Sequence, residues 1–437
     1  MAGPQLDVKA LQSALAQAGT AGISAEAAKD SAKLQELANQ APVMKLVDLV
    51  LTEAVTRRAS DVHIEGFEET VNIRFRIDGV CYEVAKPPTR LALAIASRIK
   101  ILANLDVAES RLPQDGRILM SRDNRQIDLR VSTLPTVTGE SIVLRVLDKG
   151  ALDKTLNQLG MDDEILQPIE ALIRRPHGLF LVTGPTGSGK TTTLYACLTT
   201  LNRPNVKIIT TEDPVEYDIP GLVQVAINQK ISLDFATCLR AILRHDPDIV
   251  MVGEIRDVET AEVAIQASLT GHVVFSTLHT NDAPGAVTRL IDMGVEPFLI
   301  TSTVTGVLAQ RLIRRLCPDC RTPKDPSADE LEALRLSAKD LAKPLPAPGS
   351  EGQAGLMQAP GCDACQGMGF RGRVGIFELL LMAESLQPLV LERRAVSDIR
   401  VAAREAGMRT LREDGMRKVL EGETTVAEVI RETQDYD

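Results

Sequence analysis

The sequence predicts an α/β protein with a central P-loop nucleotide-binding domain, a smaller α+β domain before it and a cysteine-containing region after it. Three observations lead to this prediction. A glycine-rich loop stands between an apolar strand and a helix, short apolar runs alternate with helical patterns around it, and two Cys-x-x-Cys pairs follow. Such alternation of strands and helices is typical of a parallel sheet that is covered on both faces.

The length and composition predict a soluble protein of several domains. A chain of 437 residues is too long for one ordinary core. Apolar residues make up 44% and charged residues 25%, as in globular proteins. The sequence has neither an apolar run of about 18 residues nor a signal-peptide pattern, so we expect a cytoplasmic location.

The segments follow in a clear order. An Ala-rich leader at 1–42 offers few large side chains for a core. An α+β domain at 43–149 begins with an amphipathic helix, continues with alternating strands such as 70–79, and contains a second helix at 90–105. The later segments that we expect are an ATPase domain at 150–310, a metal-binding subdomain at 311–372 and a helical subdomain at 373–437.

The charge balance weighs against nucleic acid as the main partner. The chain carries 49 basic and 59 acidic side chains, for a formal net charge of −10. Proteins that bind DNA or RNA usually neutralise phosphates with basic stripes. Aromatic residues make up only 3%, with no Trp, which leaves few platforms on which single-stranded bases could stack.

The glycine-rich loop, "GPTGSGKT", has the complete P-loop pattern of Gly184, Gly189, Lys190 and Thr191. Its backbone N–H groups and the following helix N-terminus would bind phosphates. We expect Lys190 to reach the β- and γ-phosphates and Thr191 to ligate Mg²⁺. The residues predicted to contact the nucleotide are Gly184, Pro185, Thr186, Gly187, Ser188, Gly189, Lys190, Thr191 and Thr192.

Acidic residues follow two of the other apolar runs. Glu212, Asp213 and Glu216 follow the run at 207–211, and Glu254 follows the run at 248–252. Parallel strands place their carboxyl ends at one edge, so these acids would face the P-loop. One would hold the Mg²⁺ shell and another would orient or deprotonate the attacking water. Each acid taken alone is equally compatible with a solvated loop carboxylate.

Two histidines flank the apolar run at 273–278. His279 follows the run and would lie near the γ-phosphate, where an imidazole could sense whether that phosphate is present. His272 precedes the run, and for it a packing role competes more strongly. We include both among the candidate catalytic residues.

The four paired cysteines predict a structural zinc site. Cys317 with Cys320 and Cys362 with Cys365 form two knuckles that together supply the four thiolates of a tetrahedral Zn²⁺ site. Four thiolates would leave no open coordination position. The Pro/Gly-rich stretch at 343–355 suits a segment that loops out between the knuckles. A redox dithiol is the alternative, which two pairs make less favourable.

Together these motifs resemble the type II secretion and type IV pilus assembly ATPase superfamily. The resemblance is carried by "GPTGSGKTTT", "TTEDPVE", "GEIRD" and "TGHVVFSTLHT". It extends upstream through "RASDVHIE" and "RLPQDGR" and downstream through "LAQRLIRRLCPDC" and "GFRGRVGIFELL". It covers about residues 43 to 430. The tetra-Cys site is similar to that of the secretion ATPases and pilus extension ATPases.

The resemblance implies a RecA-like hexameric ATPase joined to an N-terminal α+β domain of PAS-like shape. It implies that Glu216 activates water and that Glu254 stands where many P-loop enzymes carry the Asp of their second nucleotide motif. Arg130 and Arg145 match arginines that swing toward the nucleotide from the N-terminal domain. Arg240 matches an arginine at a subunit interface.

The resemblance also implies partners. Inner-membrane platform proteins of a secretion or pilus machine would hold the ATPase at the cytoplasmic face of the inner membrane. Members commonly carry a further folded domain upstream that docks on this platform, and we expect the leader at 1–42 not to contain it.

Three functions remain open on the sequence. The first is an ATPase for pseudopilus assembly in type II secretion, with type IV pilus extension as its alternative because the same motor serves both. The second is a nucleic-acid motor with a zinc ribbon, since RecA-like folds also serve helicases. The third is a scaffold that binds nucleotide without hydrolysing it. The acidic residues at 212–216 and 254 argue against this function.

Overall fold

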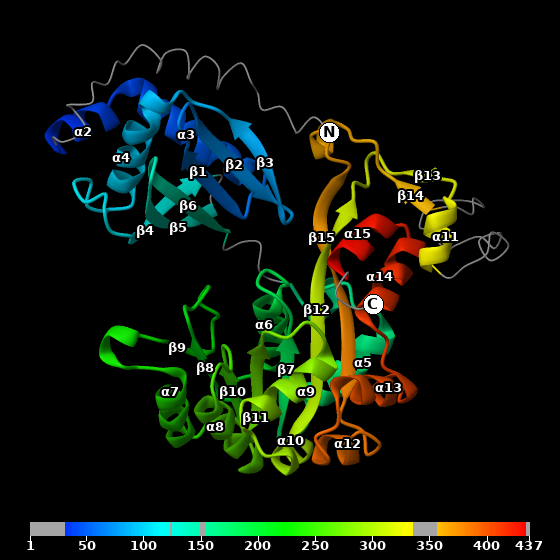
Figure 1. Cartoon of the computed structure of the whole chain (residues 1–437). Helices are drawn as coiled ribbons and strands as arrows, with labels where there is room; N and C mark the ends of the chain where they lie inside the picture. Colours follow the sequence, from blue (N-terminus) through cyan, green and yellow to red (C-terminus); the bar gives the residue numbers. More distant parts are fainter. Residues whose placement is uncertain (1–30, 123–124, 149–153, 335–355, 434–437) are drawn as a thin grey trace. The chain divides into compact units, whose positions relative to one another are not determined.

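The computed structural model describes residues 31–122, 125–148, 154–334 and 356–433 (Figure 1). The chain divides into two compact units, one made of residues 1–152 with 360–369 and the other of residues 153–359 with 370–437. Most of the predicted leader and the Pro/Gly-rich stretch at 343–355 lie outside the described residues. Among the described helices, none is long and apolar enough to cross a membrane.

The first unit contains a six-stranded antiparallel sheet. Its strands are β1 (Asp61–Gly66), β2 (Val71–Ile77), β3 (Val80–Ala85), β4 (Gln114–Arg122), β5 (Arg125–Thr136) and β6 (Gly139–Asp148). They lie in the order β3-β2-β1-β6-β5-β4. Burial alternates along β2, with Val71, Ile73, Phe75 and Ile77 inside, so this strand shows the period of two that the sequence predicted.

Three helices belong to the same unit. They are α2 (Ser31–Ala38), α3 (Ala41–Thr56) and α4 (Ala92–Leu102), the last preceded by the 3-10 turn η2 (Thr89–Leu91). Apolar residues of α3 at helical spacing, among them Leu46, Val50 and Ala54, pack in one core with Phe75 of β2 and Leu144 of β6. Full burial of a Leu or Val contributes about 1.5–3 kcal/mol, so this face holds α3 on the sheet.

The second unit contains a seven-stranded sheet. Its strands are β7 (Gly178–Thr183), β8 (Ile208–Glu212), β9 (Val223–Ala226), β10 (Ile249–Val252), β11 (Val273–Leu278), β12 (Val304–Leu316) and β15 (Phe370–Leu381). The order is β15-β12-β7-β11-β10-β8-β9. All neighbours are parallel except β15, which runs antiparallel to β12. A separate ladder joins β13 (Thr322–Lys324) to β14 (Leu356–Gln358).

Helices cover both faces of this sheet, as predicted. The described helices of this unit are α5 (Asp163–Ile173), α6 (Lys190–Leu201), α7 (Phe235–Ile242), α8 (Val258–Leu269), α9 (Ala283–Asp292), α10 (Pro297–Thr303), α11 (Ala328–Leu334), α12 (Gln387–Leu391), α13 (Val396–Glu405), α14 (Leu411–Leu420) and α15 (Val426–Glu432). Short 3-10 turns are η4 (Leu156–Gln158), η5 (Gln229–Ile231), η6 (Leu243–His245) and η8 (Asp363–Cys365). Alternate residues of β7 divide the core. Phe180 and Val182 pack with α5 and α6, whereas Leu179 and Leu181 pack with α7 to α9 and the C-terminal helices.

The end of the ATPase sheet differs from the prediction. The sequence placed a domain boundary at 311 and assigned 373–437 to helices, but β12 continues through this boundary and β15 is a sheet strand. Each strand contains a mainly apolar stretch that is buried on both faces, at 306–310 in β12 and at 374–380 in β15. Periodicity alone does not distinguish such a run from a buried helix.

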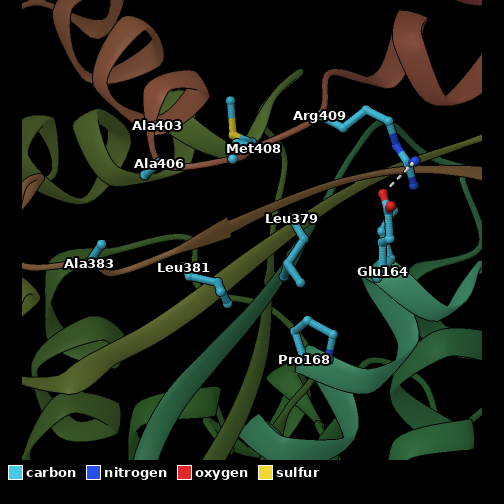
Figure 2. A pocket seen from close by; sticks show the side chains of 11 residues that line it. Glu164, Pro168, Leu379, Leu381, Ala383, Ala403, Ala406, Met408 and Arg409 are labelled. Carbon is cyan, nitrogen blue, oxygen red and sulfur yellow. Dashed lines mark hydrogen bonds and ion pairs between the residues drawn. The ribbon is translucent and has the colours of Figure 1, made fainter.

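A small hollow lies between α5, β15 and α13 (Figure 2). Leu379 and Leu381 line it, and Arg409 approaches Glu164 within 3.2 Å at its edge. Because side chains alternate along a strand, Glu378 lies on the other face of β15, where the neighbouring Leu380 packs in the core that contains α9.

Candidate active site and metal centre

The P-loop connects β7 to α6. Gly184, Gly187 and Gly189 have φ values of +145°, +83° and +91°, which side-chain-bearing residues rarely adopt. A Cβ on Gly184 would also lie 2.4 Å from the backbone oxygen of Gln310 on the neighbouring strand β12. The loop therefore requires glycine at these positions, and α6 begins at Lys190 with its free N–H groups at the loop.

Lys190 lies over the loop that precedes it. Its Nζ donates hydrogen bonds to the carbonyl oxygens of Gly184 at 2.7 Å and Pro185 at 3.2 Å. Burial lowers the pKa of Lys190 to about 8, against the opposing effect of the Glu254 carboxylate. The lysine is therefore held at the position where phosphate oxygens would meet the loop.

Glu254 and His279 meet at the carboxyl edge of the sheet. Glu254 follows β10 and His279 follows the neighbouring parallel strand β11. His279 Nε2 lies 3.1 Å from Glu254 Oε2, and Arg256 donates to Glu254 Oε1 at 2.5 Å. Partial burial by itself raises the pKa of Glu254, but the bonds and charges of Arg256 and His279 outweigh it, so this pKa lies below its usual value.

The acidic loop after β8 starts from a buried carboxylate. Glu212 accepts hydrogen bonds from the Tyr195 hydroxyl, from Thr210 Oγ1 at 2.5 Å and from Gln224 Nε2 at 3.0 Å. Burial, reinforced by the bond to Glu212, raises the pKa of Tyr195, so its hydroxyl remains a donor. Both carboxylate oxygens of Glu212 thus bind protein groups that fix the start of the loop.

The rest of this loop lies at the same edge of the sheet. Asp213 is exposed and Glu216 is partly buried. The peptide bond between Asp213 and Pro214 is cis. Because β8 and β10 are parallel neighbours, the loop starts beside the turn that carries Glu254. The structure therefore brings the P-loop, the acidic loop, Glu254 and His279 to one edge.

His272 and Arg240 lie apart from these residues. His272 precedes β11, so the six residues of the strand separate it from His279 by about 20 Å. Its Nδ1 lies 2.9 Å from the carbonyl oxygen of Ala267. Arg240 is on α7, about half exposed, and pairs with Glu259 on α8.

Arg130 and Arg145 belong to the first unit and are direct cross-strand partners on β5 and β6. The same register places Arg117 of β4 beside Arg130 and Asp61 of β1 beside Arg145. Arg145 Nε lies 3.2 Å from Asp61 Oδ1. Residues directly opposite in a ladder share one face, so three arginines form a cationic row across the sheet. We call Arg117, Arg130 and Arg145 the arginine row.

The four paired cysteines gather in one place. The sulfur atoms of Cys317, Cys320, Cys362 and Cys365 all lie within 4.8 Å of one another, and Cys317 and Cys365 are buried. Backbone N–H groups of Cys362 and Gly369 donate to the Cys365 sulfur at 3.1 Å and 3.3 Å. This donor set fits a tetrahedral zinc ion.

Comparison with known proteins identifies the family. The profile described as "Type II/IV secretion system protein" matches residues 36–431, nearly the whole chain. The chain belongs to this family. One relative is the type II secretion system protein E of Pseudomonas aeruginosa. It is 50% identical to this chain over 411 residues, which cover 94% of this chain and 79% of that protein.

Other family members are nearly as similar. The type II secretion system ATPase E of Vibrio cholerae is 50% identical over 94% of this chain and 79% of its own length. The type IV pilus assembly ATPase PilB of Myxococcus xanthus is 47% identical over 94% of this chain and 71% of its own length.

Two solved structures share the fold. The ATPase DotB of Legionella pneumophila superposes with a TM-score of 0.62 at 20% identity, over 87% of this chain and 93% of that one. The pilus retraction motor PilT superposes with a TM-score of 0.57 at 23% identity, over 90% of this chain and 97% of that one. These similarities show that the chain has the same α/β fold as DotB and PilT.

Sequence reasoning missed one residue that supports the P-loop. Gln310 on β12 is buried, donates from Nε2 to the Ser188 backbone oxygen at 2.8 Å and accepts from Thr193 Oγ1 at 2.7 Å. It therefore supports the P-loop from the neighbouring strand. The available signal was a single amide within the apolar stretch "VLAQRLI".

Proposed function

We propose that this chain is an ATP hydrolase that powers assembly of a pseudopilus for type II protein secretion. The observation that carries the proposal is the meeting of Lys190, Glu254 and His279 at one sheet edge, in a chain 50% identical to a type II secretion protein E. The test is phosphate release from ATP by the purified chain with and without Mg²⁺. Hydrolysis should require Mg²⁺ and be abolished in Lys190→Ala, and full turnover in that variant would contradict the site.

Each group at this edge has a proposed role in hydrolysis. The N–H groups of the P-loop at 184–192 and the ammonium of Lys190 bind the β- and γ-phosphates. Thr191 and Glu254 would hold Mg²⁺, which neutralises charge on the phosphate oxygens. Glu254 is suited to this role because its depressed pKa keeps it ionised. His279, bonded to Glu254, contacts the γ-phosphate and reports its presence.

The acidic loop supplies the proposed general base. Glu216 orients the attacking water and accepts its proton. Glu212, held by Tyr195, Thr210 and Gln224, fixes the beginning of the loop, and the exposed Asp213 would add negative charge that favours Mg²⁺.

The arginine row suits a phosphate. Like charges directly opposite each other in a ladder are destabilising, and here Arg117, Arg130 and Arg145 are consecutive cross-strand partners. Asp61 offsets part of this repulsion by pairing with Arg145, and Asp128 of β5 offsets more by pairing with Arg117. A bound nucleotide phosphate would offset more, because a guanidinium binds phosphate oxygens with two parallel hydrogen bonds. We propose that Arg130 and Arg145 contact the nucleotide and couple its charge to the position of their domain.

The working form is proposed to be a homo-hexamer. Arg240, on the surface of α7, would act at the contact between neighbouring subunits. His272 lies at the opposite end of β11 from His279. We propose that it affects hydrolysis only indirectly, through the sheet or through a neighbouring subunit. The tetra-Cys cluster would hold a structural zinc ion.

The ATPase would act at the cytoplasmic face of the inner membrane, bound there by platform proteins of the secretion machine, with no nucleic acid involved. A complementation experiment separates this function from pilus extension. Expression in a strain that lacks its own type II secretion ATPase should restore enzyme export. Restoration of pili without export would favour pilus extension, and a steep, salt-sensitive stimulation of ATPase by DNA would favour a nucleic-acid motor.

A further inference from the structure

The turn between β11 and α9, residues 279–282, is fixed on one side to the nucleotide site. His279 Nε2 lies 3.1 Å from Glu254 Oε2. The backbone N–H of Thr280 donates to Thr183 Oγ1 at 2.9 Å, and the two threonine hydroxyls lie 2.8 Å apart. Thr183 is the last residue of β7 before the P-loop. The first half of the turn is therefore held by the strand that carries the P-loop.

The second half of the turn is held by the C-terminal part of the unit. Asp282 caps α9 by accepting the Gly285 N–H at 2.8 Å with one carboxylate oxygen. Its other oxygen accepts a hydrogen bond from Arg400 on α13. The Asp282 side chain is buried, and Arg400 is partly exposed. This pair joins α13 directly to the turn.

Glu378 makes a second connection one residue further on. This buried glutamate on β15 accepts the Ala283 N–H at 2.8 Å with Oε1, and its Oε2 lies 3.4 Å from the Leu411 nitrogen. Ala283 and Leu411 are the first residues of α9 and α14. Their N–H groups have no partner within their own helices, so one carboxylate serves two helix starts.

Burial of the Glu378 carboxylate at this position costs free energy. Its neighbours on the same face of β15, Ile376 and Leu380, are core residues. An ionised carboxylate in such surroundings loses its hydration, and two backbone donors compensate for this only in part. A leucine at this place would fill the same core without that cost. The glutamate therefore points to a task other than packing.

We propose that Glu378 and Arg400 are positioning residues for ATP hydrolysis. They hold two consecutive residues, Asp282 and Ala283, and so set where the turn places the His279 imidazole against Glu254. A shift of α13 or α14 is transmitted through these two side chains to the nucleotide site. The inference rests on the proposed function of that site, and it adds a path by which the C-terminal helices act on it.

The test compares matched variants of the full chain in steady-state ATP hydrolysis. Arg400→Gln and Glu378→Gln should lower kcat by about tenfold or more, because small displacements of a catalytic group are enough to do so. KM for ATP should stay within about twofold of wild type, since the P-loop is untouched. Arg400→Lys should recover part of the loss. The control is Arg404→Gln on the same helix, whose partner is Glu413 at 2.7 Å rather than the turn.

A second readout does not depend on turnover. The chain has five histidines, so spectra of ¹³C-histidine-labelled protein are simple, and loss of a signal in His279→Gln assigns that residue. The His279 signal should move in Arg400→Gln and stay in place in Arg404→Gln. An unmoved signal together with wild-type kcat in Arg400→Gln would overturn the inference.

The two proposals fail in different ways. If Glu378→Gln does not fold, the Arg400 variants still decide the outcome. A wild-type chain that hydrolyses no ATP would contradict the proposed function, and the His279 signal would then decide the connection by itself.

Discussion

His279 Nε2 lies 3.1 Å from Glu254 Oε2, although 25 residues separate the two along the chain. The contact arises because β10 and β11 are parallel neighbours and end at the same edge of the sheet. Arg256 binds the other oxygen of Glu254 at 2.5 Å. Together these donors keep Glu254 ionised next to the P-loop, as a carboxylate near Mg²⁺ must be.

Removing either partner of this contact should slow hydrolysis. Glu254→Gln should lower kcat by about 10²-fold and raise the Mg²⁺ concentration needed for half-maximal rate, because a neutral amide is a weaker metal ligand. His279→Gln should lower kcat by about tenfold. Phosphate release measured across a Mg²⁺ series checks both. His245, exposed in η6, supplies the control. A His279→Gln variant as active as His245→Gln would show that His279 has no role in hydrolysis.

The pH dependence of ATP binding should report Lys190. Its pKa of about 8 means that the ammonium is charged below pH 8 and loses its proton above it. Affinity for ATP should therefore be nearly constant from pH 7 to 7.5 and should fall above pH 8. Well above pH 8, each further pH unit should lower the affinity by about tenfold. Calorimetric titrations over this range check the expectation. Lys190→Arg stays charged throughout and should show no such fall. An equal fall in that variant would assign the effect to another group.

Glu378 should make stability depend on pH in the direction opposite to most carboxylates. The pKa of Glu378 is raised to about 7, mainly by burial and further by the nearby Asp282, against the opposing effects of the Ala283 and Leu411 N–H groups and the charge of Arg400. The folded chain thus binds a proton that the unfolded chain, with an ordinary value near 4.5, releases. Stability from this group is present below about pH 4.5 and is lost as pH rises through 7.

Thermal unfolding at pH 6 and pH 8.5 checks this sign. The apparent Tm of wild type should fall by a few degrees more between these pH values than that of Glu378→Gln, which cannot titrate. Equal changes in both proteins would mean that Glu378 keeps an ordinary pKa.

Zinc should be bound and should stabilise the fold. Elemental analysis of the purified chain should give about one zinc per chain, and Cys317→Ser should lose it together with several degrees of apparent Tm. Cys81→Ser changes an isolated cysteine of the first unit and should keep the metal. Wild-type protein that is fully folded and free of zinc after purification without chelators would contradict the metal site.

Local motifs made most of the ATPase site predictable. The P-loop pattern fixes backbone geometry, because three glycines with positive φ leave few other solutions. Acids and His279 after apolar runs were predicted to converge because parallel strands end together, and the structure brings them to one edge. Paired cysteines similarly predicted the cluster in which four sulfurs lie within 4.8 Å.

Contacts made by the tertiary fold were not predictable in this way. Gln310 and Glu378 lie on strands that join the sheet from far along the chain, and their partners, Ser188 and Ala283, are not neighbours in sequence. The sequence also gave no reason to pair Arg130 with Arg145, since this depends on the register of β5 and β6. Strands buried on both faces, such as β15, lack the alternation that reveals register and element type.

We propose that the P-loop holds the phosphates while Glu216 activates the water, and the Glu216→Gln variant separates these two roles. ATP binding and steady-state phosphate release are measured on the same preparation of this variant. We expect wild-type affinity for ATP and a kcat lowered by about 10²-fold or more. Wild-type kcat in a variant that binds ATP normally would contradict it.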